Sequence, residues 1–221
     1  MNAQRSSDSV SASSWRSARL FVTDEFAAPP VILRVDDSVI GTLGNFSAST
    51  GKAKSKKTFN VCAIVAAAMT GGTVLNYSAS LPPEKRRILY VDTEQSRFHC
   101  KRVLCRILRL AGLPTDVHPP LLEFLCLRGY ATKERLRKIE EAIYDLDDLG
   151  LVVIDGIRDL AHDINSPGEA TDLITKLMQW TDERRIHIHT VLHLNKGDDN
   201  TRGHLGTELN NKAETCLLYT S

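Results

Sequence analysis

Two patterns of apolar residues alternate along the chain. Short apolar runs, typical of buried strands, alternate with longer stretches in which apolar residues recur every three or four positions, typical of amphipathic helices. Predicted strands cover residues 46–50, 88–91, 122–127, 151–154 and 186–192, and predicted helices cover 58–69, 96–111, 132–147 and 169–184. This alternation predicts βαβ units, and therefore an α/β fold with a mostly parallel, twisted sheet and helices on both faces.

The two ends of the chain depart from this alternation. Residues 1–28 are rich in serine and predict a flexible N-terminal segment with a short helix over 18–26. Apolar runs at 31–35 and 39–40 flank Asp36-Asp37 and predict a small hairpin at the start of a core that covers 29–221. Cys216-Leu-Leu-Tyr219 begins a further strand, and a core strand rarely lies at a bare terminus. We therefore expect the core to be truncated at its C-terminus.

Composition excludes several classes of protein. The chain has 221 residues, 42% of them hydrophobic and 25% charged, which is typical of a globular domain. Its net charge of +1 gives no global basic field, so any contact with nucleic acid must come from a local patch. The longest apolar stretch, 61–69, is too short to span a bilayer, so no membrane partner is expected. The five cysteines form no C-x-x-C pair, which favours a reducing cytoplasm over a disulfide or zinc framework.

The segment that follows the first core strand resembles a phosphate-binding loop, G-x-x-x-x-G-K-[S/T]. With Gly51 as the first glycine, Lys57 and Thr58 fall on the last two positions, and Lys56 stands where the motif has its second glycine. Backbone N–H groups at a helix N-terminus attract anions, a lysine adds charge at the β- and γ-phosphates, and a threonine hydroxyl suits Mg²⁺. The predicted nucleotide-binding segment is Gly51, Lys52, Ala53, Lys54, Ser55, Lys56, Lys57, Thr58 and Phe59. The alternative interpretation is a basic surface turn before a helix.

Acidic residues follow two of the buried strands. Asp155 ends the run Leu151-Val-Val-Ile154, a pattern typical of a carboxylate that supports Mg²⁺ together with Thr58. Glu94 follows the strand 88–91 and could act as the general base that activates water. Taken alone, Asp155 could be a turn residue and Glu94 a solvated helix cap. Because parallel strands end at the same sheet edge, their conjunction with the loop favours one site.

Histidines and an arginine near the last predicted strand extend this pattern. His193 ends the strand and could sense the γ-phosphate, and Arg202 in the following loop could reach a neighbouring subunit's phosphate, as could Lys212. Taken alone, Arg202 could equally be an ordinary surface residue. His187 and His189 alternate with isoleucines and therefore share one strand face. We expect them under a helix or in solvent rather than on a metal.

The order of these motifs resembles the RecA-like ATPase core, and within it the hexameric replicative-helicase branch that includes plasmid RepA and DnaB. The resemblance runs from about Val31 to Tyr219 and rests on GKAKSKKT, ILYVDTE, LVVIDGIRDL, VLHLNK and RGHLGTEL, which are similar to ATPases of bacterial mobile elements and plasmids. It implies that Lys57 and Thr58 hold phosphate and Mg²⁺, with Asp155 supporting the metal. It further implies that Glu94 activates water, His193 senses the γ-phosphate and Arg202 acts in trans.

These observations together predict a Mg²⁺-dependent ATPase. By the resemblance it forms a homo-oligomeric, hexameric ring and acts on DNA, expected to be single-stranded, in replication or transfer of a mobile element. Candidate DNA contacts are Arg158, Arg202 and the loop after Lys196. Two other functions stay open at this point: a nucleotide-dependent regulatory or partner-binding module with weak hydrolysis, which Lys56 favours, and a small-molecule kinase, for which the sequence has no arginine-rich lid segment.

Overall fold

The computed structural model describes residues 14–52, 55–193 and 203–219. Its strands are β1 (Val31–Val35), β2 (Ser38–Thr42), β3 (Phe46–Gly51), β4 (Thr73–Val74), β5 (Tyr77–Ala79), β6 (Arg87–Asp92), β7 (Leu122–Cys126), β8 (Leu149–Asp155), β9 (His187–His193) and β10 (Thr215–Tyr219). Its α-helices are α1 (Lys57–Thr70), α2 (Arg97–Leu110), α3 (Thr132–Asp145), α4 (Pro167–Arg184) and α5 (Gly203–Lys212). Short 3₁₀ turns cover Ser14–Ala18, Pro83–Lys85 and Ile157–Leu160.

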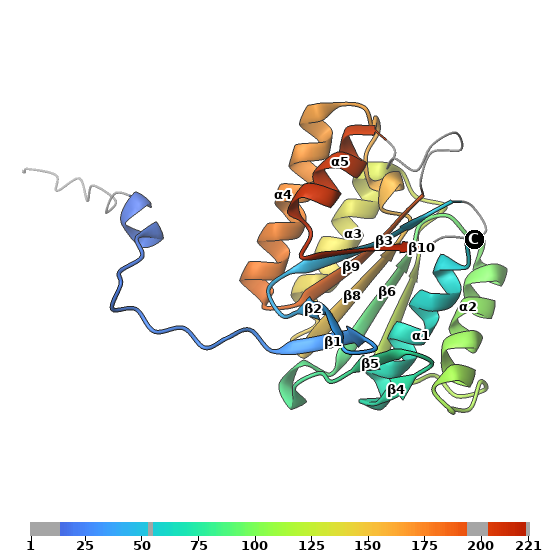
Figure 1. Cartoon of the computed structure of the whole chain (residues 1–221). Helices are drawn as coiled ribbons and strands as arrows, with labels where there is room; N and C mark the ends of the chain where they lie inside the picture. The colour runs from blue at the N-terminus through green and yellow to red at the C-terminus, as the bar shows by residue number, and fades with distance from the viewer. Residues whose placement is uncertain (1–13, 53–54, 194–202, 220–221) are drawn as a thin grey trace, which may run out of the picture.

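A six-stranded sheet forms the centre of the molecule, in the order β10-β3-β9-β8-β6-β7. All five pairings in it are parallel. Helices α1 and α2 cover one face, and α3, α4 and α5 cover the other (Figure 1). The predicted α/β class with a parallel sheet and helices on both faces is therefore confirmed.

Continuous apolar runs in the central strands arise because both faces of the sheet are buried. On β8, Leu151 and Val153 face the cluster under α1 and α2, whereas Val152 and Ile154 face the cluster under α3 and α4. Successive side chains point to opposite faces of a strand, so four consecutive apolar residues fill two separate cores. Because all its strands run parallel, their carboxyl ends, and the polar residues that follow them, lie at one edge of the sheet.

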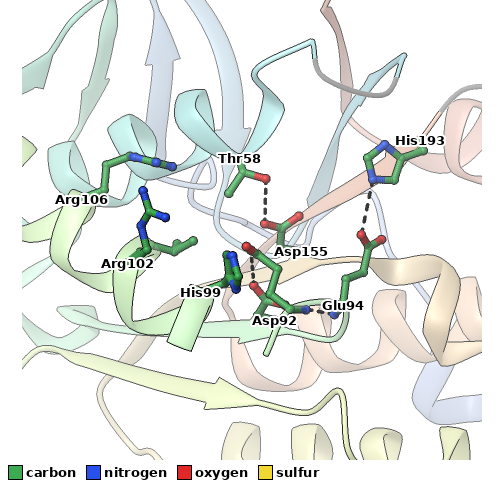
Figure 2. Close-up of a pocket in the computed structure, with 10 residues that line it drawn as sticks. Thr58, Asp92, Glu94, His99, Arg102, Arg106, Asp155 and His193 are labelled. Atoms are coloured by element: carbon green, nitrogen blue, oxygen red, sulfur yellow. Dashed lines mark hydrogen bonds and ion pairs between the residues drawn. The ribbon is translucent and has the colours of Figure 1, made fainter. Parts of the chain in front are cut away.

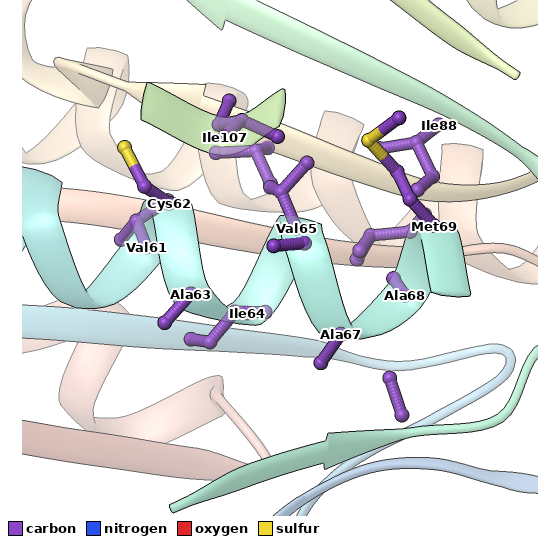
Figure 3. Packing of buried hydrophobic residues seen from close by; sticks show 14 of the residues in the cluster. Val61, Cys62, Ala63, Ile64, Val65, Ala67, Ala68, Met69, Ile88 and Ile107 are labelled. Atoms are coloured by element: carbon purple, nitrogen blue, oxygen red, sulfur yellow. The ribbon is translucent and has the colours of Figure 1, made fainter. Parts of the chain in front are cut away.

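Helix α1 is buried on nearly all sides, from Val61 to Met69. Figure 3 shows its side chains reaching in several directions, toward Ile88 on the main sheet and Ile107 on α2. The small side chains of Ala63, Ala66, Ala67 and Ala68 let α2, the main sheet and a second sheet approach together. A helix that is apolar all round is typical of such a position, so α1 anchors the loop before it rigidly in the core.

The N-terminal hairpin belongs to a larger element than predicted. Strands β1 and β2 pair as expected, and β5 and β4 extend them into an antiparallel four-stranded sheet in the order β2-β1-β5-β4. The predicted helix over 18–26 is wrong: the chain there is extended, exposed and directed away from the body of the molecule (Figure 1). Leu20, Phe21 and Val22 are exposed, so no buried face stabilises a helix there.

Among the described residues, no helix has both the length and the apolar character required to cross a bilayer.

Candidate functional site

The loop between β3 and α1 begins at a glycine that cannot carry a side chain. A Cβ atom at Gly51 would lie 2.7 Å from Ser55 Oγ and 2.7 Å from the backbone oxygen of Tyr219 on β10. Gly51 pairs directly with Tyr219 on one side and with His193 on the other. The predicted first glycine therefore has a steric role, which is to let the loop leave the sheet between two neighbouring strands.

Lysine 57 lies inside the loop and is buried. Its ammonium donates hydrogen bonds to the carbonyl oxygens of Gly51 (2.7 Å) and Lys52 (2.7 Å) and to Ser55 Oγ (3.2 Å). An ammonium has three hydrogens, so these contacts use all of them. Burial lowers the pKa of Lys57, while the carboxylates of Asp155 and Glu94 oppose that shift. The loop thus holds a positive charge in place at the mouth of the site.

Lysine 56 has a left-handed backbone conformation, with φ 62° and ψ 19°, at the residue before α1 begins. Such a conformation is unfavourable for a residue with a Cβ and is normally taken by glycine. Lys56 therefore differs from the second glycine of the motif in its side chain, but its backbone has the conformation that a glycine would take. The Lys56 side chain is exposed, and its carbonyl accepts hydrogen bonds from the amides of Phe59 and Asn60.

Aspartate 155 ends β8 directly beside the start of α1 (Figure 2). Its Oδ2 accepts hydrogen bonds from the Thr58 hydroxyl at 3.2 Å and the Tyr90 hydroxyl at 2.8 Å. Burial, together with the nearby acids Asp92 and Glu94, raises the pKa of this carboxyl to about 6, against the opposing effect of its hydrogen bonds. The predicted pair of Thr58 and Asp155 is therefore brought into direct contact.

Aspartate 92, at the end of β6, shapes the turn that presents Glu94. Its Oδ1 accepts from the backbone amides of Glu94 (3.0 Å) and Gln95 (2.8 Å), and its Oδ2 accepts from Gln95 Nε2 (2.7 Å). Asp92 is completely buried, whereas Glu94 is exposed. Asp92 therefore holds the turn in place, and the side chain of Glu94 stays accessible to a ligand.

Glutamate 94 faces His193 across the site. Glu94 Oε2 lies 3.6 Å from His193 Nε2, and the contact is drawn in Figure 2. The interaction with His193 is the main reason why the pKa of Glu94 lies below its usual value, against an opposing effect of burial. Within the part of the chain that the structure describes, Nδ1 of His193 is buried without a hydrogen-bond partner. The pair therefore joins the end of β9 to the turn after β6.

A pocket of about 330 Å³ lies between these groups. Acidic residues line one side of it, and Figure 2 shows His99, Arg102 and Arg106 on α2 directed toward the same space. No role was predicted from the sequence for Tyr90, Asp92 or these three residues of α2. The spacing of 99, 102 and 106 along a helix after a strand-end acid was an available signal, since residues three and four apart share a helix face.

The side chains of Phe59, Arg158 and Lys212 make none of the hydrogen bonds described above. Phe59 is part of the first turn of α1, and 38% of its surface is exposed. Ala53, Lys54 and Arg202 lie outside the described residues. Arg158 and Lys212 are exposed.

Of the two positions expected for His187 and His189, under a helix or in solvent, the exposed one is wrong. Both are completely buried, and the Nδ1 of His187 lies 2.8 Å from the carbonyl oxygen of Thr42 on β2. A Cβ atom at Gly41 would lie 2.8 Å from the His187 ring, so a glycine backbone covers this histidine. Strand β2 therefore covers His187, where a helix was one of the expected neighbours.

The residues present fit Mg²⁺ and a triphosphate. A buried carboxylate beside two further acids is costly unless a cation joins it, and Thr58 supplies a second hard oxygen. The amides at the start of α1, with the ammonium of Lys57, suit phosphate oxygens. Thr58 and Asp155 would hold the metal, and the loop from Gly51 to Thr58 would hold the phosphates.

The chain was compared with curated proteins and with models of protein families. No curated protein matches the chain. A family model described as AAA domain matches residues 16–199, which include β3, α1 and the strands that end in Asp92, Asp155 and His193. The chain therefore belongs to the AAA domain family of P-loop ATPases.

Proposed function

We propose that the protein hydrolyses ATP with Mg²⁺ as a RecA- and RepA-like motor that forms rings and acts on DNA. The observation that carries the ATPase proposal is the convergence of Lys57, Thr58, Asp155 and Glu94 on one sheet edge, although they come from three separate stretches of the chain. Lys57 lies close enough to Asp155 and Glu94 for both carboxylates to raise its pKa against the effect of burial, so cation and acids act on one another within a single site.

The chemistry assigned to the residues is in-line attack of water on the γ-phosphate. Glu94 accepts a proton from the water as its oxygen bonds to phosphorus, and the bond to the oxygen that bridges the β- and γ-phosphates breaks, leaving ADP and phosphate. Because its pKa lies below the usual value, Glu94 is ionised at neutral pH and can accept that proton. Lys57 neutralises charge on the phosphate oxygens. Mg²⁺, when bound, supplies further neutralisation of that charge.

The finer parts of the proposal rest on the resemblance in sequence. Ring formation, trans action by Arg202, and work on single-stranded DNA during replication or transfer of a mobile element are proposed on that ground. The exposed position of Arg158, at the same sheet edge as Asp155, is compatible with a DNA contact.

Steady-state ATP hydrolysis measured with and without single-stranded DNA tests this function. We expect hydrolysis that DNA stimulates several-fold, and DNA binding that weakens steeply with salt because phosphate contacts dominate. Turnover that is absent under all conditions would contradict the ATPase, whereas turnover indifferent to DNA would contradict the motor alone.

A nucleotide-dependent regulatory module is the second candidate, and the conformation of Lys56 favours it. A left-handed residue with a side chain costs about 1–2 kcal/mol relative to glycine, and the three bonds of Lys57 to its own loop must be exchanged on binding. Tight nucleotide binding with slow, DNA-independent turnover would identify this function.

A further inference from the structure

A row of buried polar side chains joins β3, β9 and β10, outside the contacts described for the site. Ser47 Oγ lies 2.7 Å from His187 Nε2 and 2.7 Å from His189 Nδ1, and Ser49 Oγ lies 2.8 Å from His189 Nε2. The two serines and two histidines are completely buried. The row ends at the carbonyl oxygen of Thr42 on one side, and at Tyr219 and Tyr77 on the other.

The hydrogens in this row have one consistent arrangement. Burial lowers the pKa of His187 to about 4 and of His189 to about 3, so both rings are neutral at pH 7 and each carries one N–H. The Thr42 carbonyl can only accept, so Nδ1 of His187 donates to it and Nε2 must accept the hydrogen of Ser47. Ser47 then has no hydrogen left for the second ring.

The same reasoning fixes the second ring. Nδ1 of His189 donates to Ser47 Oγ, and Nε2 accepts the hydrogen of Ser49. Ser49 lies 3.4 Å from the Tyr219 hydroxyl, and the Tyr77 and Tyr219 hydroxyls are 3.0 Å apart. Every ring nitrogen therefore has a partner, and a change at one position leaves a buried polar atom unsatisfied at the next.

This row leads directly into the site. In the pairing of β3 with β9, Ser47 lies opposite His189, Ser49 opposite Val191, and Gly51 opposite His193. Alternate residues share a strand face, so the serines point to the same face as Gly51, and His189 to the same face as His193. The ring of His189 bonds both serines at once, and it would lose these bonds if β9 slid along β3.

We propose that His189, held between Ser47 and Ser49, is a positioning residue. It fixes the register of β9 against β3, and thereby the position of His193 relative to the phosphate-binding loop. The inference rests on the proposed function for its catalytic consequence, but the positioning itself does not require hydrolysis. Moving β9 would displace His193 from Glu94, whereas the contacts of Lys57, Thr58 and Asp155 come from other elements.

Ser49→Ala tests the inference with Thr190→Val as the matched control. Ser49→Ala removes the donor to His189 Nε2, and Ser49→Thr keeps a hydroxyl there. Thr190 is a buried residue of β9 on the face opposite to His189. Its hydroxyl donates to the Ser47 carbonyl, so its loss costs one buried hydrogen bond as well. Melting temperature, Kd for ADP with Mg²⁺, kcat, and the NMR resonances of the His193 ring are measured for all three variants.

For Ser49→Ala we expect kcat to fall about tenfold with Kd within about threefold of the parent protein, because displacement of a positioned group acts mainly on the reaction. The His193 ring resonances shift, and Ser49→Thr restores both. Thr190→Val loses a similar amount of thermal stability and leaves kcat and those resonances unchanged. The inference is overturned if the His193 resonances do not shift in Ser49→Ala, or if they shift equally in Ser49→Ala and Thr190→Val. If the parent protein does not hydrolyse ATP, the ATPase proposal fails, and the resonances still decide the positioning.

Discussion

At the scale of single residues, Lys56 is the most unusual feature of the chain. Its φ of 62° is normally taken by glycine, although this residue carries a long side chain. Lys56→Gly is expected to stabilise the fold by about 0.5–1 kcal/mol, because relief of the left-handed strain exceeds the added entropy of the unfolded chain. Urea unfolding measures the change. Asn60→Gly, inside α1, is the control and should destabilise by about 0.3 kcal/mol, the difference in helix propensity between the two residues. A loss of stability in both variants would contradict strain at Lys56.

Lys57 is expected to be indispensable for turnover. Lys57→Ala removes the buried cation and leaves the carbonyls of Gly51 and Lys52 without their donor, so we expect hydrolysis to fall by at least about 100-fold. A phosphate-release assay measures it. Lys101→Ala, an exposed lysine on α2, serves as the control and should retain full turnover. Full turnover in Lys57→Ala would remove the loop from the site.

Glu94 is expected to affect the reaction and not the binding of nucleotide. Glu94→Gln cannot accept the proton of water, so turnover should fall by about 10²–10⁴-fold while the Kd for nucleotide stays within a few-fold. Titration calorimetry and single-turnover hydrolysis separate the two quantities, with exposed Glu84→Gln as the control. Equal losses in Kd and turnover would argue against a general base.

Protonation of the buried histidines predicts acid sensitivity. In the folded protein the pKa values of His187 and His189 are about 4 and about 3, against 6.5 for a free histidine. As pH falls below 6.5, the unfolded chain takes up protons that the folded protein does not, so stability decreases. At pH 5 the loss is about 2 kcal/mol per histidine relative to pH 7.5. Urea unfolding across this range should show a slope smaller by about one proton in His189→Asn. An unchanged slope would contradict the assignment.

At the scale of elements, packing on two sides of the sheet explains what could be predicted. The strands of the main sheet and the helices α1 to α4 lie within a few residues of the predicted ranges, because the spacing of their apolar residues reflects which faces are buried. Helix α5 was not predicted: Gly203, Gly206 and two asparagines give it low propensity, and it forms by burying Leu205 and Leu209 on the core. Strands β4 and β5 are too short for a period to be read.

The candidate site divides in the same way. Thr58, Glu94, Asp155 and His193 could be predicted to meet, because parallel strands end at one edge. The roles of Tyr90 and Asp92 could not be predicted, since the Tyr90 hydroxyl bonds Asp155 on the neighbouring strand and the Asp92 carboxylate accepts from an amide of its own turn. The polar row of His187 and His189 was missed because its partners lie on β2 and β3, about 140 residues earlier in the chain.

The close packing around α1 is expected to limit the volume of side chains at its buried positions. Ala66 is completely buried in the core around α1. Ala66→Leu adds three carbons where no space is left and is expected to destabilise by about 1–3 kcal/mol. Urea unfolding measures this, with Lys101→Leu on the exposed face of α2 as the control. Equal, small effects in both would show that α1 has room.

At the scale of the whole molecule, the proposed ring makes a prediction about mass. One chain has a mass of 24.5 kDa. With Mg²⁺ and a non-hydrolysable ATP analogue, we expect a particle about six times heavier, because Arg202 would complete the site of its neighbour. Light scattering after gel filtration measures the mass. Lys57→Ala should not respond to the analogue, and a parent protein that stays at one chain with the analogue would contradict the ring.

The three hydrogen bonds that Lys57 makes to its own loop give this segment a closed resting form. An arriving phosphate group must replace two carbonyl oxygens and a hydroxyl, so binding is an exchange of partners for one ammonium. Small anions that engage only the ammonium gain little from that exchange. We expect a triphosphate also to meet the helix amides and the threonine, and therefore to bind this loop more tightly than free sulfate or orthophosphate, without any contact to a base or sugar.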